Sequence, residues 1–224
     1  MPQTPPPAKK AAQGRQKFPQ IPAEFDATEI MKLDAPKLIQ ILKDPGASVF
    51  HKAKACQKLA VTGGKDAVPA LAALLEHQEL SNYARFGLEP NPDPSADAAL
   101  RAVLGRLDGR LLAGVITSIG VRRDGKAADA LGKLLAHKDD EIAGAAAAAL
   151  ARIGGVAAAK LLQQTLGKAR ESVRPVMARA CLISADGLVK SNRAQAMELY
   201  EFLSGGSLPK PVRLAAIRAM SSLA

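Results

Sequence analysis

Residues 142–162 read IAGAAAAALARIGGVAAAKLL. An apolar, alanine-rich run ends at Gly154, and a second apolar run with helical spacing follows directly. The same succession recurs at Gly63, Gly120 and Gly187. Repetition at intervals of roughly thirty to forty residues is typical of a helical solenoid, in which each helix pair stacks on its neighbours. We expect these glycines to end helices in the left-handed conformation, which suits a residue without Cβ.

The composition favours the same architecture. Of the 224 residues, 48% are hydrophobic but only 3% are aromatic, and Trp is absent. Alanine and leucine favour helices that pack closely through small side chains. We therefore predict an all-α fold over residues 34–224, a right-handed α-solenoid (α-α superhelix) of about six antiparallel helix pairs.

Each predicted pair has a first helix, A, and a second helix, B. The A helices are expected at 35–42, 67–75, 97–104, 127–135, 157–162 and 194–203. Small or apolar residues recur three, four, seven and eight positions after an anchor residue in each of four B helices, which indicates one buried face. These anchors are Leu80, Ile142, Val173 and Val212. An earlier B helix is expected to bury Val49, Ala53, Cys56 and Ala60.

Residues 1–23 are expected to form a disordered basic arm. They hold six prolines and the cations Lys9, Lys10, Arg15 and Lys17, with no acid. Such a segment cannot bury a core. The formal charge of +10 falls to +6 without these four cations, a modest excess for a dedicated nucleic-acid binder. A second proline-rich stretch, residues 89–94, predicts a rigid spacer whose Asp93 or Ser95 caps the next helix.

Catalytic, cofactor and metal sites find no support in the sequence. His51, His77 and His137 fall in or beside turns, and matching positions in separate repeats are too far apart to share a metal ion. Asp139, Asp140 and Glu141 suit the start of a helix, where anions complement the helix dipole. Cys56 and Cys181 fall within helices and are expected to be buried and unpaired. No apolar run of membrane-spanning length occurs, so we expect no membrane insertion.

The B helices that open with Val173-Arg174 and Val212-Arg213, together with the ending Ile153-Gly154-Gly155, resemble HEAT-type (HEAT-like) repeats. Residues 85–90 and 118–124 are also similar to HEAT arrays of large planctomycete-type bacterial proteins. In HEAT-type units an Asp of the A-to-B turn often pairs with the Arg that opens helix B. The resemblance implies an incomplete ladder, because Glu171 is the only acid in the two corresponding turns.

The resemblance implies that the B helices form the concave inner wall. On it we expect a partner-binding strip of Arg85, Phe86, Arg174, Arg179, Arg213 and Arg218. Small residues such as Ala113, Gly114, Ala143, Ala147 and Ala148 would let another backbone approach closely, or would simply pack between helices. The arginines could equally cover apolar surface and pair with local acids.

The leading hypothesis is a non-enzymatic scaffold that binds a protein segment or an adjacent domain, with an acidic partner as one option. The alternative is nucleic-acid backbone binding through a basic concave face, as in HEAT-like DNA glycosylases. The last pair lacks a polar terminal helix, so we expect a fragment of a longer array. A native start at Met1 would fit a cytoplasmic protein, and an excised fragment would fit a periplasmic or exported one.

Overall fold

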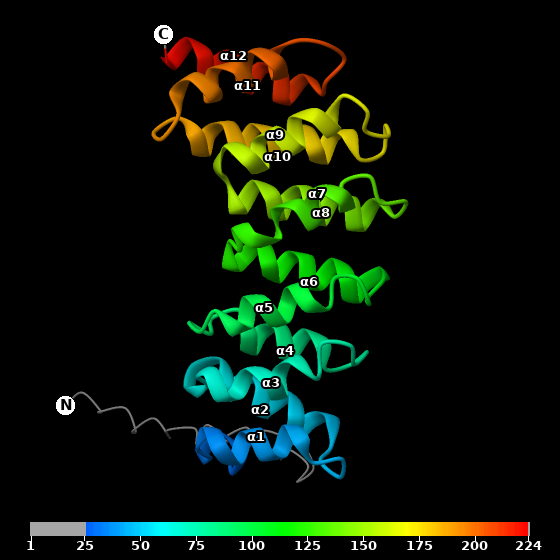
Figure 1. Cartoon of the computed structure of the whole chain (residues 1–224), viewed down its shortest axis with the longest axis vertical. Helices are drawn as coiled ribbons and strands as arrows, with labels where there is room; N and C mark the ends of the chain where they lie inside the picture. The colour runs from blue at the N-terminus through cyan, green and yellow to red at the C-terminus, as the bar shows by residue number, and fades with distance from the viewer. Residues whose placement is uncertain (1–25, 224) are drawn as a thin grey trace, which may run out of the picture.

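The computed structural model describes residues 26–223, and its regular structure over this range is entirely helical. The helices form one stack from α1 at one end to α12 at the other (Figure 1). The A helices are α1 (Ala35–Lys43), α3 (Val68–Ala72), α5 (Ser95–Ala102), α7 (Ala128–Leu134), α9 (Gly155–Leu166) and α11 (Arg193–Ser204). The B helices are α2 (Val49–Thr62), α4 (Ser81–Leu88), α6 (Gly109–Arg122), α8 (Asp140–Ile153), α10 (Arg174–Leu188) and α12 (Lys210–Leu223). The 3-10 helices are η2 (Ile30–Lys32), η3 (Lys65–Ala67) and η4 (Gly125–Ala127).

The packing is that of a solenoid. Each A helix contacts the B helix that follows it, and each B helix contacts the next B helix along the stack, from α2 to α12. The prediction of an all-α solenoid is thus confirmed. The right-handed sense of its superhelix stays a prediction. The expected arm, residues 1–23, lies outside the described residues.

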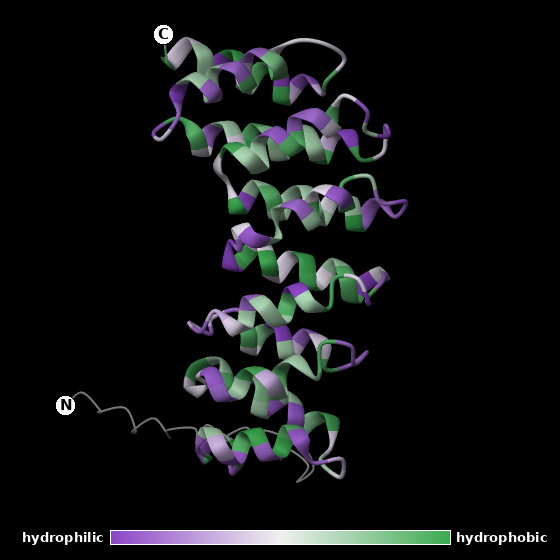
Figure 2. Ribbon diagram, in the orientation of Figure 1, coloured by the Kyte–Doolittle hydropathy of each residue, from purple (hydrophilic) through white to green (hydrophobic). Residues whose placement is uncertain are grey.

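The buried face of the B helices explains how the pairs hold together. The anchors Leu80, Ile142, Val173 and Val212 are all buried, and so are the residues four positions further on. Hydrophobic residues run along the helices, whereas hydrophilic residues gather at the turns on both sides of the stack (Figure 2). Cys56 and Cys181 are fully buried free thiols, as expected.

The predicted face was too wide at one edge. The residues three positions after the anchors, Tyr83, Ala145, Val176 and Ala215, are half-buried or exposed. In helix α2 Ala53 and Cys56 are buried as expected, but Val49 is 39% exposed and Ala60 is only half-buried. Ala55 and Leu59 are fully buried in their place. At 100° per residue, a shift of one position carries a side chain from the centre of the buried face to its border.

The glycines do not act as a uniform set of helix caps. Gly154 has φ +73° and ends α8 as expected, but Gly63 ends α2 in an extended conformation. Gly120 and Gly187 lie inside α6 and α10. The left-handed residue that ends α6 is Arg123, with φ +53°. The expectation is therefore wrong for three of the four glycines.

Gly120 serves a different purpose, the close approach of α6 to α8. A Cβ added at Gly120 would lie 2.8 Å from the Cα and 3.0 Å from the Cβ of Ala149. We expect Gly120→Ala to lower the free energy of unfolding by about 1–3 kcal/mol, because the two backbones must separate. Urea unfolding followed by circular dichroism measures this loss.

Gly144→Ala is the matched control within α8. Its added Cβ would lie 3.6 Å from Val176 Cγ1, an ordinary van der Waals distance. The free energy of unfolding should rise by about 0.5–1 kcal/mol, as for a typical glycine replaced inside a helix. Equal effects of the two substitutions would contradict the assignment of Gly120 as a contact point.

Two of the predicted A helices are shorter than expected. Helix α3 stops at Ala72 and α5 at Ala102, and turns fill the remainder of each predicted range. Pro69 lies in the first turn of α3, where its missing N–H has no helical partner to lose.

Candidate partner-binding surface

A row of side chains on the B helices stays open to solvent. Aligning α6 with α8 places Leu111 at the anchor position. The residues six positions after the five anchors are then all exposed, and they are Phe86, Thr117, Ala148, Arg179 and Arg218. We call this the open row. It lies on the side of each helix that the apolar face leaves uncovered.

A groove crosses the open side of α4, α6 and α8. One pocket of about 450 Å³ lies between the starts of α4 and α6, and its lining includes Glu79, Tyr83, Arg85 and Arg110. A second pocket of about 310 Å³ shares Arg85 and Arg110 with the first. It continues over Gly114 and Thr117 to Glu141 and Ala145. We call the two together the α4–α8 groove.

Arg85 forms part of the floor of this groove. Its guanidinium donates hydrogen bonds to the Gly114 carbonyl at 3.1 Å, to Ser118 Oγ at 3.3 Å and to Asn82 Oδ1 at 2.9 Å. A Cβ on Gly114 would lie 2.7 Å from Arg85 Cζ, so only glycine lets the guanidinium rest on α6. Desolvation lowers the pKa of Arg85. Its buried Nε has no hydrogen-bond partner within residues 26–223.

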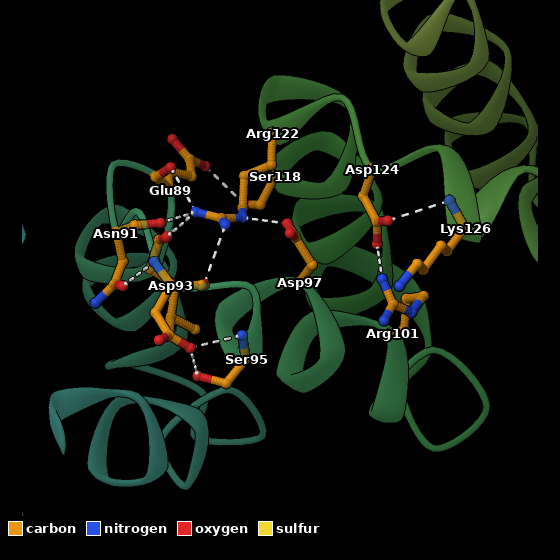
Figure 3. Close-up of polar contacts among 11 residues, drawn as sticks. Glu89, Asn91, Asp93, Ser95, Asp97, Arg101, Ser118, Arg122, Asp124 and Lys126 are labelled. Carbon is orange, nitrogen blue, oxygen red and sulfur yellow. Dashed lines mark hydrogen bonds and ion pairs between the residues drawn. The ribbon is translucent and has the colours of Figure 1, made fainter. Parts of the chain in front are cut away.

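Arg122 fixes the relation between α4 and α6 (Figure 3). Its side chain is only 8% exposed. It pairs with Asp97 and donates to the carbonyls of Leu88, Glu89 and Asn91, at 2.8, 3.0 and 2.6 Å. One guanidinium thus ties the end of α4 and the proline-rich connection to the end of α6. The segment predicted as a spacer, residues 89–94, is a loop that curves around the Arg122 side chain.

Further polar contacts hold the same connection in place, and Figure 3 shows those between Asp93 and Ser95. Asn91 is buried, and its amide donates to the Gly64 carbonyl at 3.0 Å. Asp93 accepts bonds from the N–H and hydroxyl of Ser95, which lower the pKa of Asp93. The expected capping of α5 by Asp93 or Ser95 is wrong, because Pro94 occupies the N-cap position and no side chain caps the helix; the bonds of Asp93 to Ser95 instead close the turn just before it.

Asp124 anchors the turn that follows α6 (Figure 3). It is buried, pairs with Arg101 and accepts the N–H of Lys126 at 3.2 Å. Arg122, at the end of α6, pairs with Asp97 of α5, and Asp124, in the turn that follows, pairs with Arg101 of α5. The two ion pairs therefore attach α5 to the end of α6 and to this turn.

The structure separates the predicted strip residues into two groups. Phe86, Arg179 and Arg218 lie in the open row, and Phe86 is 53% exposed. Neither Arg179 nor Arg218 forms an ion pair within the described part of the chain. These two guanidinium groups are therefore available to a partner.

The other three predicted arginines are half-buried. Arg174 donates to the Ala169 carbonyl at 3.0 Å, at the turn before α10. Arg213 Nε is buried and lacks a hydrogen-bond partner inside the described range. Arg85 is committed to α6, as described above. Most of the small residues expected on the inner wall, including Ala113, Ala143 and Ala147, are buried and pack between helices.

Sequence reasoning missed Arg110, Glu141 and Thr117 as groove residues. Arg110 and Glu141 each lie one position before an anchor, as Glu79 does. One position back and six positions forward point to the same side of a helix. An anchor at Leu111 would therefore have revealed Arg110 and Thr117, and the existing anchor Ile142 already points to Glu141.

The histidines and acids have local structural roles. His77 Nδ1 accepts the N–H groups of Glu79 and Leu80, and His137 Nδ1 accepts the N–H of Asp139. Asp139 caps α8, as predicted.

Burial raises the pKa of Cys56 and Cys181 to about 12, so neither thiol ionises near neutral pH. No cluster with metal-binding composition and no helix suited to span a membrane occurs within residues 26–223.

Comparisons with known proteins agree on the architecture. The family of HEAT repeats matches residues 96–183, from α5 to α10. A designed armadillo repeat protein in complex with the peptide (KR)4 is 18% identical, with a TM-score of 0.56 over 86% of this chain and 100% of that chain. Another designed armadillo repeat protein is 20% identical, with a TM-score of 0.53 over 85% and 100%. No curated protein gives a significant match. Identities this low establish a shared fold alone.

Proposed function

Because the chain is a HEAT-like helical repeat protein, we propose that it acts as a non-enzymatic scaffold that binds a segment of a protein partner along the open side of its B helices. Helical solenoids use such extended surfaces for binding. The observation that carries the proposal is the open row, which continues from the α4–α8 groove to the unpaired cations Arg179 and Arg218.

The charges on this surface suggest which kind of peptide it binds. The groove mixes Arg85 and Arg110 with Glu79 and Glu141, so it suits a polar peptide more than a uniformly negative backbone. Beyond the groove, Arg179 and Arg218 favour an acidic stretch of the partner. The designed relative that binds (KR)4 recognises a basic peptide. We propose the opposite charge preference for this chain.

An octapeptide of alternating Asp and Glu tests this preference, with (KR)4 as the charge-reversed probe. We expect the acidic peptide to bind, and the double variant Arg179→Glu with Arg218→Glu to weaken its affinity by about tenfold or more. Fluorescence anisotropy at two salt concentrations measures both effects. The matched control is Arg193→Glu, which changes a charge at the start of α11 outside the open row.

Preferential binding of (KR)4, or equal losses in the control, would contradict the proposed surface. Binding of duplex DNA with a steep salt dependence would instead support recognition of a phosphate backbone.

A further inference from the structure

We propose that the turn between α8 and α9 is a binding site for a phosphate-type oxyanion. A pocket of about 380 Å³ lies where the ends of α6, α8 and α10 meet. Arg123, Arg152, Gly154, Gly155 and Ser184 contribute to its lining, which contains no acidic residue. It shares no residue with the α4–α8 groove, so it is independent of the proposed partner surface.

Backbone donors are available at this pocket. Gly154 and Gly155 have φ of +73° and +79°, and α9 begins at Gly155 without a side-chain cap. No hydrogen bond within the described residues takes up the N–H groups of Gly155, Val156 and Ala157. Free N–H groups at the positive end of a helix dipole favour an anion. An uncapped helix start alone would not identify a site.

A buried hydroxyl provides the second, independent observation. Ser184 on α10 is only 2% exposed and lines the same pocket. Its Oγ has no hydrogen-bond partner anywhere in residues 26–223. Leaving a buried hydroxyl unpaired costs free energy, which a ligand oxygen in the pocket would recover.

Two guanidinium groups supply the charge. Arg123 is held in the left-handed conformation at the end of α6, and Arg152 lies on the last turn of α8. Both are exposed, and neither side chain has a hydrogen bond or ion pair within the described part of the chain. Planar guanidinium forks match the oxygen geometry of phosphate. The donors therefore come from three successive repeats and surround one cavity.

A titration with inorganic phosphate at constant ionic strength, followed by the backbone amide signals of the full chain, tests the proposal. We expect saturable shifts at residues 154–157, with a dissociation constant of about 1 mM or tighter. O-phosphoserine is the second probe. Tighter binding of the monoester would identify a phosphorylated side chain as the source, and tighter binding of phosphate would identify the free ion.

Three variants probe the donors separately. Arg152→Gln removes one charge from an exposed position, and Arg123→Gly removes the other but keeps a residue that favours positive φ. Each should weaken phosphate binding by about tenfold. Ser184→Ala should weaken it by about fivefold. Arg106→Gln is the control, because it removes an exposed arginine between α5 and α6, outside both this pocket and the open row, and should leave the affinity unchanged.

The proposal is overturned if phosphate gives no saturable shift up to about 10 mM. It is equally overturned if the first turns of α8 and α10 respond as strongly as α9, or if Arg152→Gln and Arg106→Gln have the same effect. Since Arg152 is exposed, its variant gives a reading even if Ser184→Ala or Arg123→Gly impairs folding.

Discussion

Replacing Arg122 with Met should lower the free energy of unfolding by about 3–5 kcal/mol, the range for loss of one partner of a buried ion pair. Methionine retains much of the apolar volume but donates no hydrogen bond. Asp97 and the carbonyls of Leu88, Glu89 and Asn91 would lose their donor inside the protein. Urea unfolding by circular dichroism measures the total loss. Amide hydrogen exchange should locate it between α4 and α5.

Arg179→Met is the matched control, because Arg179 is an exposed B-helix arginine without an ion pair in residues 26–223. Its effect should stay within about 0.5 kcal/mol. Arg122→Lys should recover only part of the stability, since an ammonium group cannot reproduce the planar fork. Adding Asp97→Ala to Arg122→Met should cost less than the sum of the single changes. A loss below about 1 kcal/mol for Arg122→Met would refute the role of this side chain as the clamp.

The sequence predicts the buried and open sides of the B helices well, and the reason is geometric. Apolar residues at helical spacing fix which side of α8 or α10 faces the core. The opposite side, with Ala148, Arg179 and Arg218, follows automatically. The limits of the buried face are harder to predict, because half-buried positions such as Ala145 tolerate almost any small residue.

The long-range polar contacts could not be predicted in the same way. Arg122 binds carbonyl groups 31 to 34 positions earlier in the chain, and a backbone acceptor leaves no trace in the amino-acid sequence. The prolines of residues 89–94 predict a non-helical segment, but the path of that segment depends on Arg122. Similarly, Gly120 looks like a helix cap until its distance to Ala149 is known.

The candidate ligand sites differ in how far sequence could lead to them. Phe86, Arg179 and Arg218 emerge from repeat alignment, since one position recurs in each unit. The phosphate-type site needs Arg123, Arg152 and Ser184, which lie near the ends of three successive B helices but do not share one repeat position. Only stacking brings these residues together. Its one sequence signal is Gly154-Gly155, which also occurs as an ordinary turn.

Truncating Leu150 to Ala should lower the free energy of unfolding by about 2–5 kcal/mol, because Leu150 is fully buried at the centre of the stack. Helix α8 packs on α6, α7, α9 and α10, so neighbouring helices hold the cavity open on several sides. Leu214→Ala makes the same chemical change on α12, where the side chain is 44% exposed, and should cost less than about 1 kcal/mol. Urea unfolding of both variants measures the difference. Equal losses at Leu150 and Leu214 would contradict the assignment of Leu150 to the core of the stack.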